Sequence, residues 1–229
     1  EEAKNSDAVY IELYTSKWYG NLKNLEKLIG KEIFELKRKD LEENSNKIIE
    51  EAKTKSLVIF VQGDPLVQTT HSSLLLEAKK HGIETKVIHN ASILSAIGET
   101  GLHVQKFGPY VTIPFPEKTK GKPPESVFGV IRENKKRELH TLCLLDVIAE
   151  ENKYMTVNPG LQVLLLGNVI DKEDKIVVFA KAGSEKPLIV YDTLDNLIKS
   201  NITDIPAVMI IPGKLHFTEK EYLELTKNV

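Results

Sequence analysis

The sequence predicts an α/β fold made of two successive domains. Short apolar runs typical of strands alternate with segments of helical spacing almost from end to end, an order typical of sheets covered by helices. A stretch with four prolines, 114–124, interrupts this alternation, because proline fits neither a helix interior nor a central strand. A chain of 229 residues can also bury two modest cores. We therefore expect domains over 1–113 and 125–229, joined by a linker over 114–124, each with a mixed or parallel sheet.

In the first half, strands are expected where apolar runs lie between turn residues. Helices are expected where apolar residues recur every three or four positions, as in 21–29, where Gly30 is placed to end the helix. Asp40 is placed to begin the next one. The expected strands are 8–13, 33–36, 57–61 and 85–88; the expected helices are 21–29, 40–54, 70–81 and 89–97; 101–114 is expected to be extended.

The second half repeats the alternation after the prolines. The expected helices are 125–137, 157–166, 193–200 and 219–227, and the expected strands are 140–147, 176–180, 188–191 and 207–211. These local patterns predict the elements and do not specify the order of the strands.

Composition excludes several classes of function. The formal net charge is −2 with no basic block, which disfavours a nucleic-acid partner. No apolar run approaches the ~18 residues of a membrane span, so no membrane partner is expected. The single cysteine, Cys143, lies in an apolar run, which favours a buried thiol in a reducing compartment such as the cytoplasm.

Four loops follow apolar strands and are rich in small or polar residues: 62–67, 89–93, the position of Asp146, and 181–184. Small residues let a ligand approach the backbone, whose amide and carbonyl groups can then bind it. Each loop alone is more often an ordinary turn. Four of them, shared between both halves, favour a ligand site between the two domains.

Several kinds of catalytic site are not indicated. The sequence has no Walker-type phosphate loop, no complete GxGxxG, no HExxH or cysteine pair for a metal, and no GxSxG. We expect no metal, and the pattern assigns no catalytic residue. A ligand site without these groups suits either transfer from an activated donor or simple binding.

Nine strings of the sequence together resemble the diphthine synthase family. They follow the family's order and span nearly the whole chain. They are YTS (14–16), LIGKEI (28–33), GDPLVQTTH (63–71), VIHNASI (87–93), GLHVQKFG (101–108), HTLCLLD (140–146), YMTVN (154–158), AKAGS (180–184) and IPGKLH (211–216).

The resemblance implies a fold and an activity. The fold is the two-domain tetrapyrrole (precorrin-like) methylase fold, with the donor in a cleft between the domains. The family transfers methyl groups from S-adenosylmethionine, repeatedly and onto one amino group, to an intermediate built on a histidine of translation elongation factor 2. Family members usually form homodimers.

The resemblance also implies a donor site of seven positions. Most are small or apolar, which suits a donor held by main-chain hydrogen bonds and apolar walls. They are Asp64, Val67, Ser92, Ile93, Leu145, Ala182 and Ala207, the last through its backbone. The family begins with a strand and a GLGL turn that precede Glu1 of this sequence, so the first strand is expected to be missing and donor binding by this chain is in question.

The attacking amine must lose a proton after each of the first two transfers, and three histidines are candidate bases: His71, His140 and His216. Two other interpretations stay open. One keeps the fold and changes the acceptor, as in a tetrapyrrole or ribosomal RNA methylase. The other is a ligand-binding module without catalysis.

Overall fold

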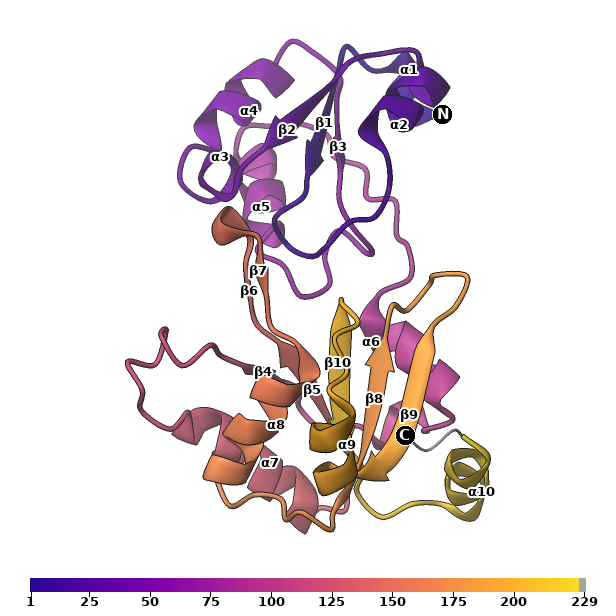
Figure 1. The fold of residues 1–229 in the computed structure, drawn as a ribbon. Helices are drawn as coiled ribbons and strands as arrows, with labels where there is room; N and C mark the ends of the chain where they lie inside the picture. Colours follow the sequence, from indigo (N-terminus) through magenta and orange to yellow (C-terminus); the bar gives the residue numbers. More distant parts are fainter. Residues whose placement is uncertain (227–229) are drawn as a thin grey trace. The chain divides into compact units, whose positions relative to one another are not determined.

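The computed structural model describes residues 1–226. They form two compact units, Glu1–Ser92 and a second unit that begins at Ile93 (Figure 1). This corrects the expected domain boundary at 113. The segment 93–113 belongs to the second unit, because β4 (Val111–Ile113) pairs in parallel with β5 (Thr141–Leu145). The proline-rich stretch 114–124 is therefore a connection inside the second unit and not a linker between domains.

The first unit is built on a three-stranded parallel sheet in the order β2-β1-β3. Parallel neighbours need crossover connections, and the helices between these strands supply them. The elements are α1 (Glu2–Asn5), β1 (Ala8–Glu12), α2 (Leu22–Ile29), β2 (Ile33–Leu36), α3 (Arg38–Glu42), α4 (Asn46–Ala52), β3 (Leu57–Phe60) and α5 (Ser72–Lys80). Because the strands are parallel, their carboxyl ends meet at one edge of the sheet.

Local signals predicted most of these elements. Gly30 adopts φ 79° and donates its N–H to the Glu26 carbonyl, so it ends α2 as expected. The expected helix 40–54 is instead two helices, because the stretch 43–45 contains Asn and Ser, which favour caps over helix interiors. The expected strand 85–88 is wrong. Ile88 is exposed, and the segment pairs with no strand.

The second unit contains a five-stranded mixed sheet in the order β4-β5-β10-β8-β9. Only β4 and β5 are parallel; the other neighbours are antiparallel. The remaining elements are α6 (Ile93–Ala96), η1 (Ile97–Thr100), η2 (Val104–Lys106), α7 (Glu125–Lys136), β6 (Val147–Ile148), η3 (Ala149–Glu151), β7 (Lys153–Tyr154), α8 (Val157–Leu166), β8 (Lys175–Ala180), β9 (Leu188–Thr193), α9 (Leu194–Ser200), β10 (Ala207–Ile211) and α10 (Phe217–Leu225).

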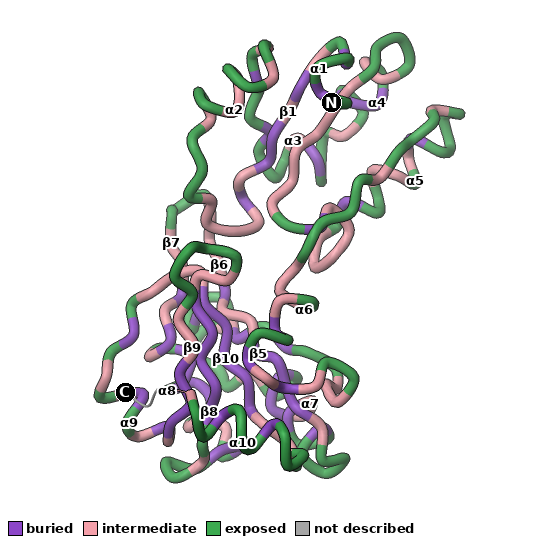
Figure 2. Tube along the Cα trace, turned by 90° about the vertical axis from the view of Figure 1, so that its right-hand side faces the viewer, coloured by how far each residue is buried: buried purple, intermediate pink, exposed green. Residues whose placement is uncertain are grey.

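This sheet is buried on both faces. Along β8, Ile176 and Val178 pack into the core that contains residues of α7, α8 and α9. The alternate residues Val177 and Phe179 pack into a second core, which contains residues of η1 and α10. Side chains alternate between the faces of a strand, so a strand covered on both sides must be apolar throughout. Figure 2 shows this burial along β5, β8 and β10.

The second half follows the sequence prediction closely. β10 and α8 have the expected bounds. The expected strand 140–147 is divided between β5 and the two-residue β6, with the buried Asp146 between them. The helix expected over 219–227 begins earlier, at Phe217, and Lys227 lies outside the described residues.

Candidate functional site

The carboxylate of Asp64 lies in the loop after β3, at the carboxyl edge of the first sheet. The residue is buried, and the loop turns at Gly63, whose φ is 72°. Asp64 Oδ1 accepts the Leu66 N–H at 2.9 Å. Its Oδ2 accepts the His89 Nδ1–H at 2.8 Å and the Asn90 N–H at 3.4 Å. These hydrogen bonds, led by that from Leu66 and then that from His89, lower the pKa of Asp64. The side chain is therefore ionised at neutral pH.

These bonds bring together two of the loops expected to bind a ligand. A Cβ added to Gly63 would lie 3.3 Å from the Ala91 carbonyl oxygen, so the two loops are in close contact. Val67 lies in the first loop, where its N–H approaches the Asp64 carbonyl oxygen at 3.4 Å. Ser92 follows Ala91 in the second loop. The structure thus gathers the three candidate donor positions of the first unit, Asp64, Val67 and Ser92, on these two loops.

In the second unit, three candidate positions lie at one end of the five-stranded sheet. Ala207 begins β10 and pairs with Ala180, the last residue of β8. Ala182 follows two residues later. Val208 pairs with Leu144, so Leu145 lies at the same end of β5. The fourth position, Ile93, begins α6, which lies beside this end of β8 in Figure 1.

Leu145 packs against helix α8 at a position that has no side chain. A Cβ added to Gly160 would lie 2.7 Å from Leu145 Cδ2 and 2.8 Å from Met209 Cε. The glycine therefore gives the two side chains the space that they occupy. Leu145 itself is only partly buried and packs at the margin of the core.

Two of the candidate bases lie at the other end of this sheet. His140 precedes β5, whereas Leu145 ends it, so the two are ~17 Å apart along the strand. His140 is fully buried; its Nε2–H donates to Glu219 Oε1 at 3.0 Å, and its Nδ1 accepts the Gly213 N–H at 2.8 Å. His216 caps α10 beside Glu219. Neither histidine is placed to take a proton near Leu145, Ala182 or Ala207.

Glu219 is the centre of a buried ionic cluster at that far end. Its side chain is fully buried, and Lys106 Nζ donates to Oε2 at 2.6 Å. Burial raises its pKa, but the hydrogen bonds from Lys106, from the His103 and His216 backbones and from His140 outweigh burial and lower the pKa to about 2. Burial lowers the pKa of His140, against the opposing effect of Glu219. This cluster joins α10 to the start of β5 and is structural.

The third candidate base, His71, lies in the first unit beside the loop of Asp64. It is buried, and its Nδ1 is 3.1 Å from the Pro65 carbonyl oxygen. Its Nε2 is 3.4 Å from the hydroxyl of Tyr14, which is also buried. Of the three candidate bases, His71 alone lies beside a candidate donor residue.

Glu12 was not anticipated from the sequence. It ends β1, is fully buried, and accepts hydrogen bonds from the Tyr14 and Thr15 backbones at 3.2 and 3.3 Å and from the Thr15 hydroxyl at 2.7 Å. The available signal was an acidic residue directly after an apolar strand and before YTS. Asp146 is likewise a brace: it accepts the Phe115 and Val147 N–H groups and the Lys118 ammonium.

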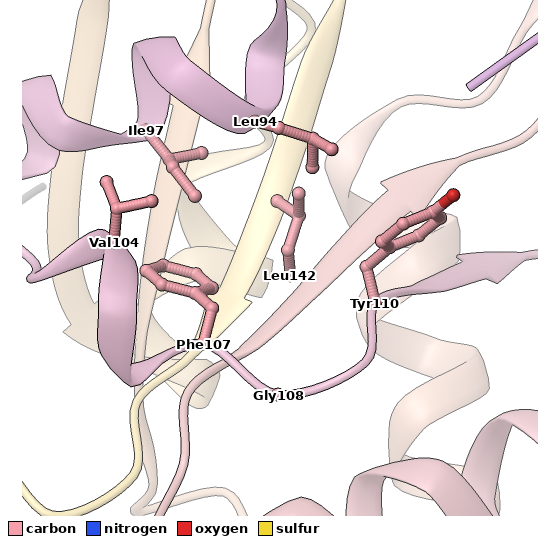
Figure 3. Close-up of a pocket in the computed structure, with 7 residues that line it drawn as sticks. All are labelled: Leu94, Ile97, Val104, Phe107, Gly108, Tyr110 and Leu142. Atoms are coloured by element: carbon pink, nitrogen blue, oxygen red, sulfur yellow. The ribbon is translucent and has the colours of Figure 1, made fainter. Parts of the chain in front are cut away.

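The second unit also contains an apolar pocket of about 210 Å³. Figure 3 shows its lining, to which Tyr110 contributes the one side-chain hydroxyl: Leu94, Ile97, Val104, Phe107, Gly108, Tyr110 and Leu142. This lining contains no charged side chain and none of the seven candidate donor positions.

Residues 1–226 contain neither a metal-binding cluster nor a membrane-spanning helix. That part of the chain has no group of three or more His, Cys, Asp or Glu side chains arranged to hold a metal ion. None of its helices combines the length and the apolar character needed to cross a membrane.

Comparison with known proteins gives consistent matches over almost the whole chain. The family model of the Tetrapyrrole (Corrin/Porphyrin) Methylases matches residues 3–198. Diphthine synthase of Methanocaldococcus jannaschii is 46% identical, covering 99% of this chain and 91% of that protein. Diphthine synthase of Methanococcus aeolicus is 41% identical, covering 100% and 91%. A crystal structure of diphthine synthase matches with a TM-score of 0.88 at 38% identity, covering 97% of this chain and 86% of that one.

Proposed function

Because this chain belongs to the diphthine synthase family of the tetrapyrrole methylases and is thus an S-adenosylmethionine-dependent methyltransferase, we propose that it methylates the diphthamide precursor on a histidine of elongation factor 2. It does so repeatedly on one amino group. The observation that carries this proposal is the 46% identity to a diphthine synthase over 99% of the chain. Because the match covers almost the whole chain and not a fragment, it supports a proposal for the specific acceptor.

Seven positions form the proposed donor site. Asp64, Val67 and Ser92 come from the first unit, and Ile93, Leu145, Ala182 and Ala207 come from the second. Their chemistry suits this donor. A carboxylate offers about four acceptor sites, and three protein donors engage Asp64, which leaves room for an ammonium or hydroxyl group. The remaining positions have small or apolar side chains.

The protein's contribution to the reaction is orientation. When bound, S-adenosylmethionine supplies a methyl group already activated on its sulfonium, so the chain needs no nucleophile of its own. Holding the acceptor amine in line with that methyl group is worth up to ~7–11 kcal/mol in well-aligned reactions. Rigid loops serve this purpose, and the bonds between Asp64, His89 and Asn90 fix the first of them.

The proton released after each of the first two transfers goes to solvent in this proposal. His140 and His216 lie at the far end of the second sheet from the candidate positions. His71 is near the donor loop, but both of its ring nitrogens face protein atoms, Pro65 O and Tyr14 Oη. A solvent acceptor is sufficient, because only one proton leaves the amine after each of these two transfers.

We also propose a cytoplasmic homodimer. Elongation factor 2, the proposed acceptor, works in translation, and a cytoplasmic enzyme would meet it there. Cys143 is fully buried, and burial raises the pKa of its thiol, which keeps the thiol protonated and unreactive. The dimer follows from the family resemblance, and sedimentation of the purified protein measures it directly.

The first prediction is stepwise methylation of elongation factor 2. The purified protein is incubated with isotopically labelled S-adenosylmethionine and with elongation factor 2 from cells that lack this activity. Mass spectrometry of the modified-histidine peptide should show successive gains of one methyl mass. Donor binding without any gain would indicate another acceptor, such as a tetrapyrrole or ribosomal RNA. Methylation of none of these acceptors would favour a binding module.

A further inference from the structure

Tyr14 and His71 connect two strand ends at the carboxyl edge of the first sheet. β1 and β3 are adjacent and parallel, so the segments that follow them emerge side by side. Tyr14 lies two residues after β1, and His71 immediately precedes α5, in the segment that follows β3. Both side chains are more than nine-tenths buried. Two buried polar side chains in contact need a defined arrangement of their protons.

The neighbours of His71 specify that arrangement. The Pro65 carbonyl oxygen can only accept a hydrogen bond, so His71 Nδ1, at 3.1 Å, carries the hydrogen. In the neutral ring Nε2 is then an acceptor, and the Tyr14 hydroxyl, at 3.4 Å, donates to it. Burial, and then the charges of Glu12 and Glu42, raise the pKa of Tyr14 to about 12. Tyr14 therefore keeps its proton and fixes the Nδ1–H tautomer.

His71 thereby holds the donor loop next to its carboxylate. Pro65 directly follows Asp64, and Asp64 Oδ1 accepts the N–H of Leu66 on the other side of the proline. The peptide between Asp64 and Leu66 is thus fixed from two directions. Glu12 holds Tyr14 in turn, because its carboxylate accepts the Tyr14 backbone N–H at 3.2 Å. The Arg38 guanidinium lies over the Tyr14 ring, 5.4 Å from the ring centroid. A continuous series of contacts runs from the end of β1 to Asp64.

We infer that His71 is a positioning residue for the methyl donor: its Nδ1–H fixes the loop that carries Asp64, and Tyr14 selects the tautomer that makes this bond. This inference rests on the proposed function, because it takes Asp64 as a donor contact. A base would act on the acceptor and affect turnover. A positioning residue of this kind affects the affinity for the donor and leaves turnover at saturating donor unchanged.

The test uses three variants and measures donor affinity by calorimetry alongside steady-state methylation. His71→Gln removes the N–H that bonds the Pro65 carbonyl oxygen, while the longer glutamine side chain still extends toward Tyr14. It should raise the Kd and KM for S-adenosylmethionine about ten-fold, the equivalent of one hydrogen bond. His71→Asn places an amide N–H near the position of Nδ1 and should restore affinity to within about three-fold. Tyr14→Phe should have an intermediate effect. For all three, kcat at saturating donor and KM for elongation factor 2 should stay at the wild-type values.

His81→Gln is the matched control. His81 is an exposed histidine at the other end of α5, and its Nδ1 also faces a carbonyl oxygen, that of Glu77. Its donor affinity should equal that of the wild type. A fall in kcat at saturating donor for His71→Gln would overturn the inference in favour of a role in chemistry. Equal losses in His71→Gln and His71→Asn would also overturn it, because the Pro65 bond would then not matter.

Folding and the proposed function are controlled separately. Circular dichroism and thermal unfolding report whether each variant is folded. If His71→Gln does not fold, Tyr14→Phe, which loses one hydroxyl, carries the test, and unchanged donor affinity there would overturn the inference. A wild-type protein that does not bind S-adenosylmethionine would instead contradict the proposed function itself.

Discussion

Asp64 has two roles in this proposal: it braces its own loop, and it contacts the methyl donor. Single substitutions can separate the two roles. Its carboxylate braces the loop by accepting the His89 ring N–H and the Asn90 backbone N–H, and it is also the one ionised side chain among the seven proposed donor positions. Loss of the charge would weaken both. The exposed side chain of His89 allows one interaction to be removed without the other.

We predict that Asp64→Asn lowers the affinity for S-adenosylmethionine about ten- to a hundred-fold, the range of a hydrogen bond to a charged group. His89→Gln, which removes much of the brace and keeps the carboxylate, should change the affinity less than about three-fold. Isothermal titration calorimetry measures both. Normal affinity in Asp64→Asn would remove Asp64 from the site, and equal losses in both variants would reduce its role to bracing.

At the scale of whole elements, two glycines differ in how much space their surroundings leave for a side chain. Gly213 follows β10, where the chain passes the segment before β5. A Cβ there would lie 2.4 Å from the Glu138 carbonyl oxygen, a backbone atom that cannot move without moving the sheet. Gly129 lies inside α7, and a Cβ there meets nothing within 4 Å. The same substitution should therefore have opposite effects at the two positions.

Gly213→Ala should destabilise the protein by about 1–3 kcal/mol through overpacking. Gly129→Ala should stabilise it by about 0.5–1 kcal/mol, because alanine restricts the unfolded chain and favours the helix. Urea unfolding followed by circular dichroism measures both changes. A Gly213→Ala variant as stable as the wild type would mean that the chain after β10 has room to move away from the Glu138 carbonyl oxygen.

Elements were predictable where their signals are local. Gly30 ends α2 through its own φ angle, and the turn at Gly63 and Asp64 follows from residue types within a few positions. The assignment of 93–113 failed because it depends on the pairing of β4 with β5, which is decided by residues far along the chain. The His140–Glu219 bond spans 79 residues, and no local pattern indicates it. The seven donor positions came from family resemblance and stay predictions.

For the whole molecule, the buried cluster around Glu219 makes the free energy of unfolding fall as the solution becomes acidic. The folded-state pKa of Glu219, about 2, lies below its ordinary value of 4.5. Its contribution is therefore present above pH 4.5 and is lost as pH falls toward 2. The pKa of His140 is also lowered from 6.5, so its contribution is present above pH 6.5 and is lost as pH falls below that value. Both effects have the same sign.

We predict that the free energy of unfolding is highest above pH 6.5 and falls in two stages on acidification, below pH 6.5 and again below pH 4.5. Urea titrations at a series of pH values between 8 and 3 measure it. Glu219→Gln, the matched variant, should lose much of the second stage while starting from a lower stability at pH 7. A pH profile identical to that of the wild type would show that Glu219 does not cause the lower stage.

The bonds of Asp64 to His89 and Asn90 have a thermodynamic consequence for the connection between the two units. His89 and Asn90 are among the last residues of the first unit, which ends at Ser92. If donor binding at Asp64 orders this segment, linkage requires the reverse effect by the same factor. Substitutions that stiffen residues 89–91 would then tighten donor binding without touching the ligand, and cleavage of the chain there would weaken it.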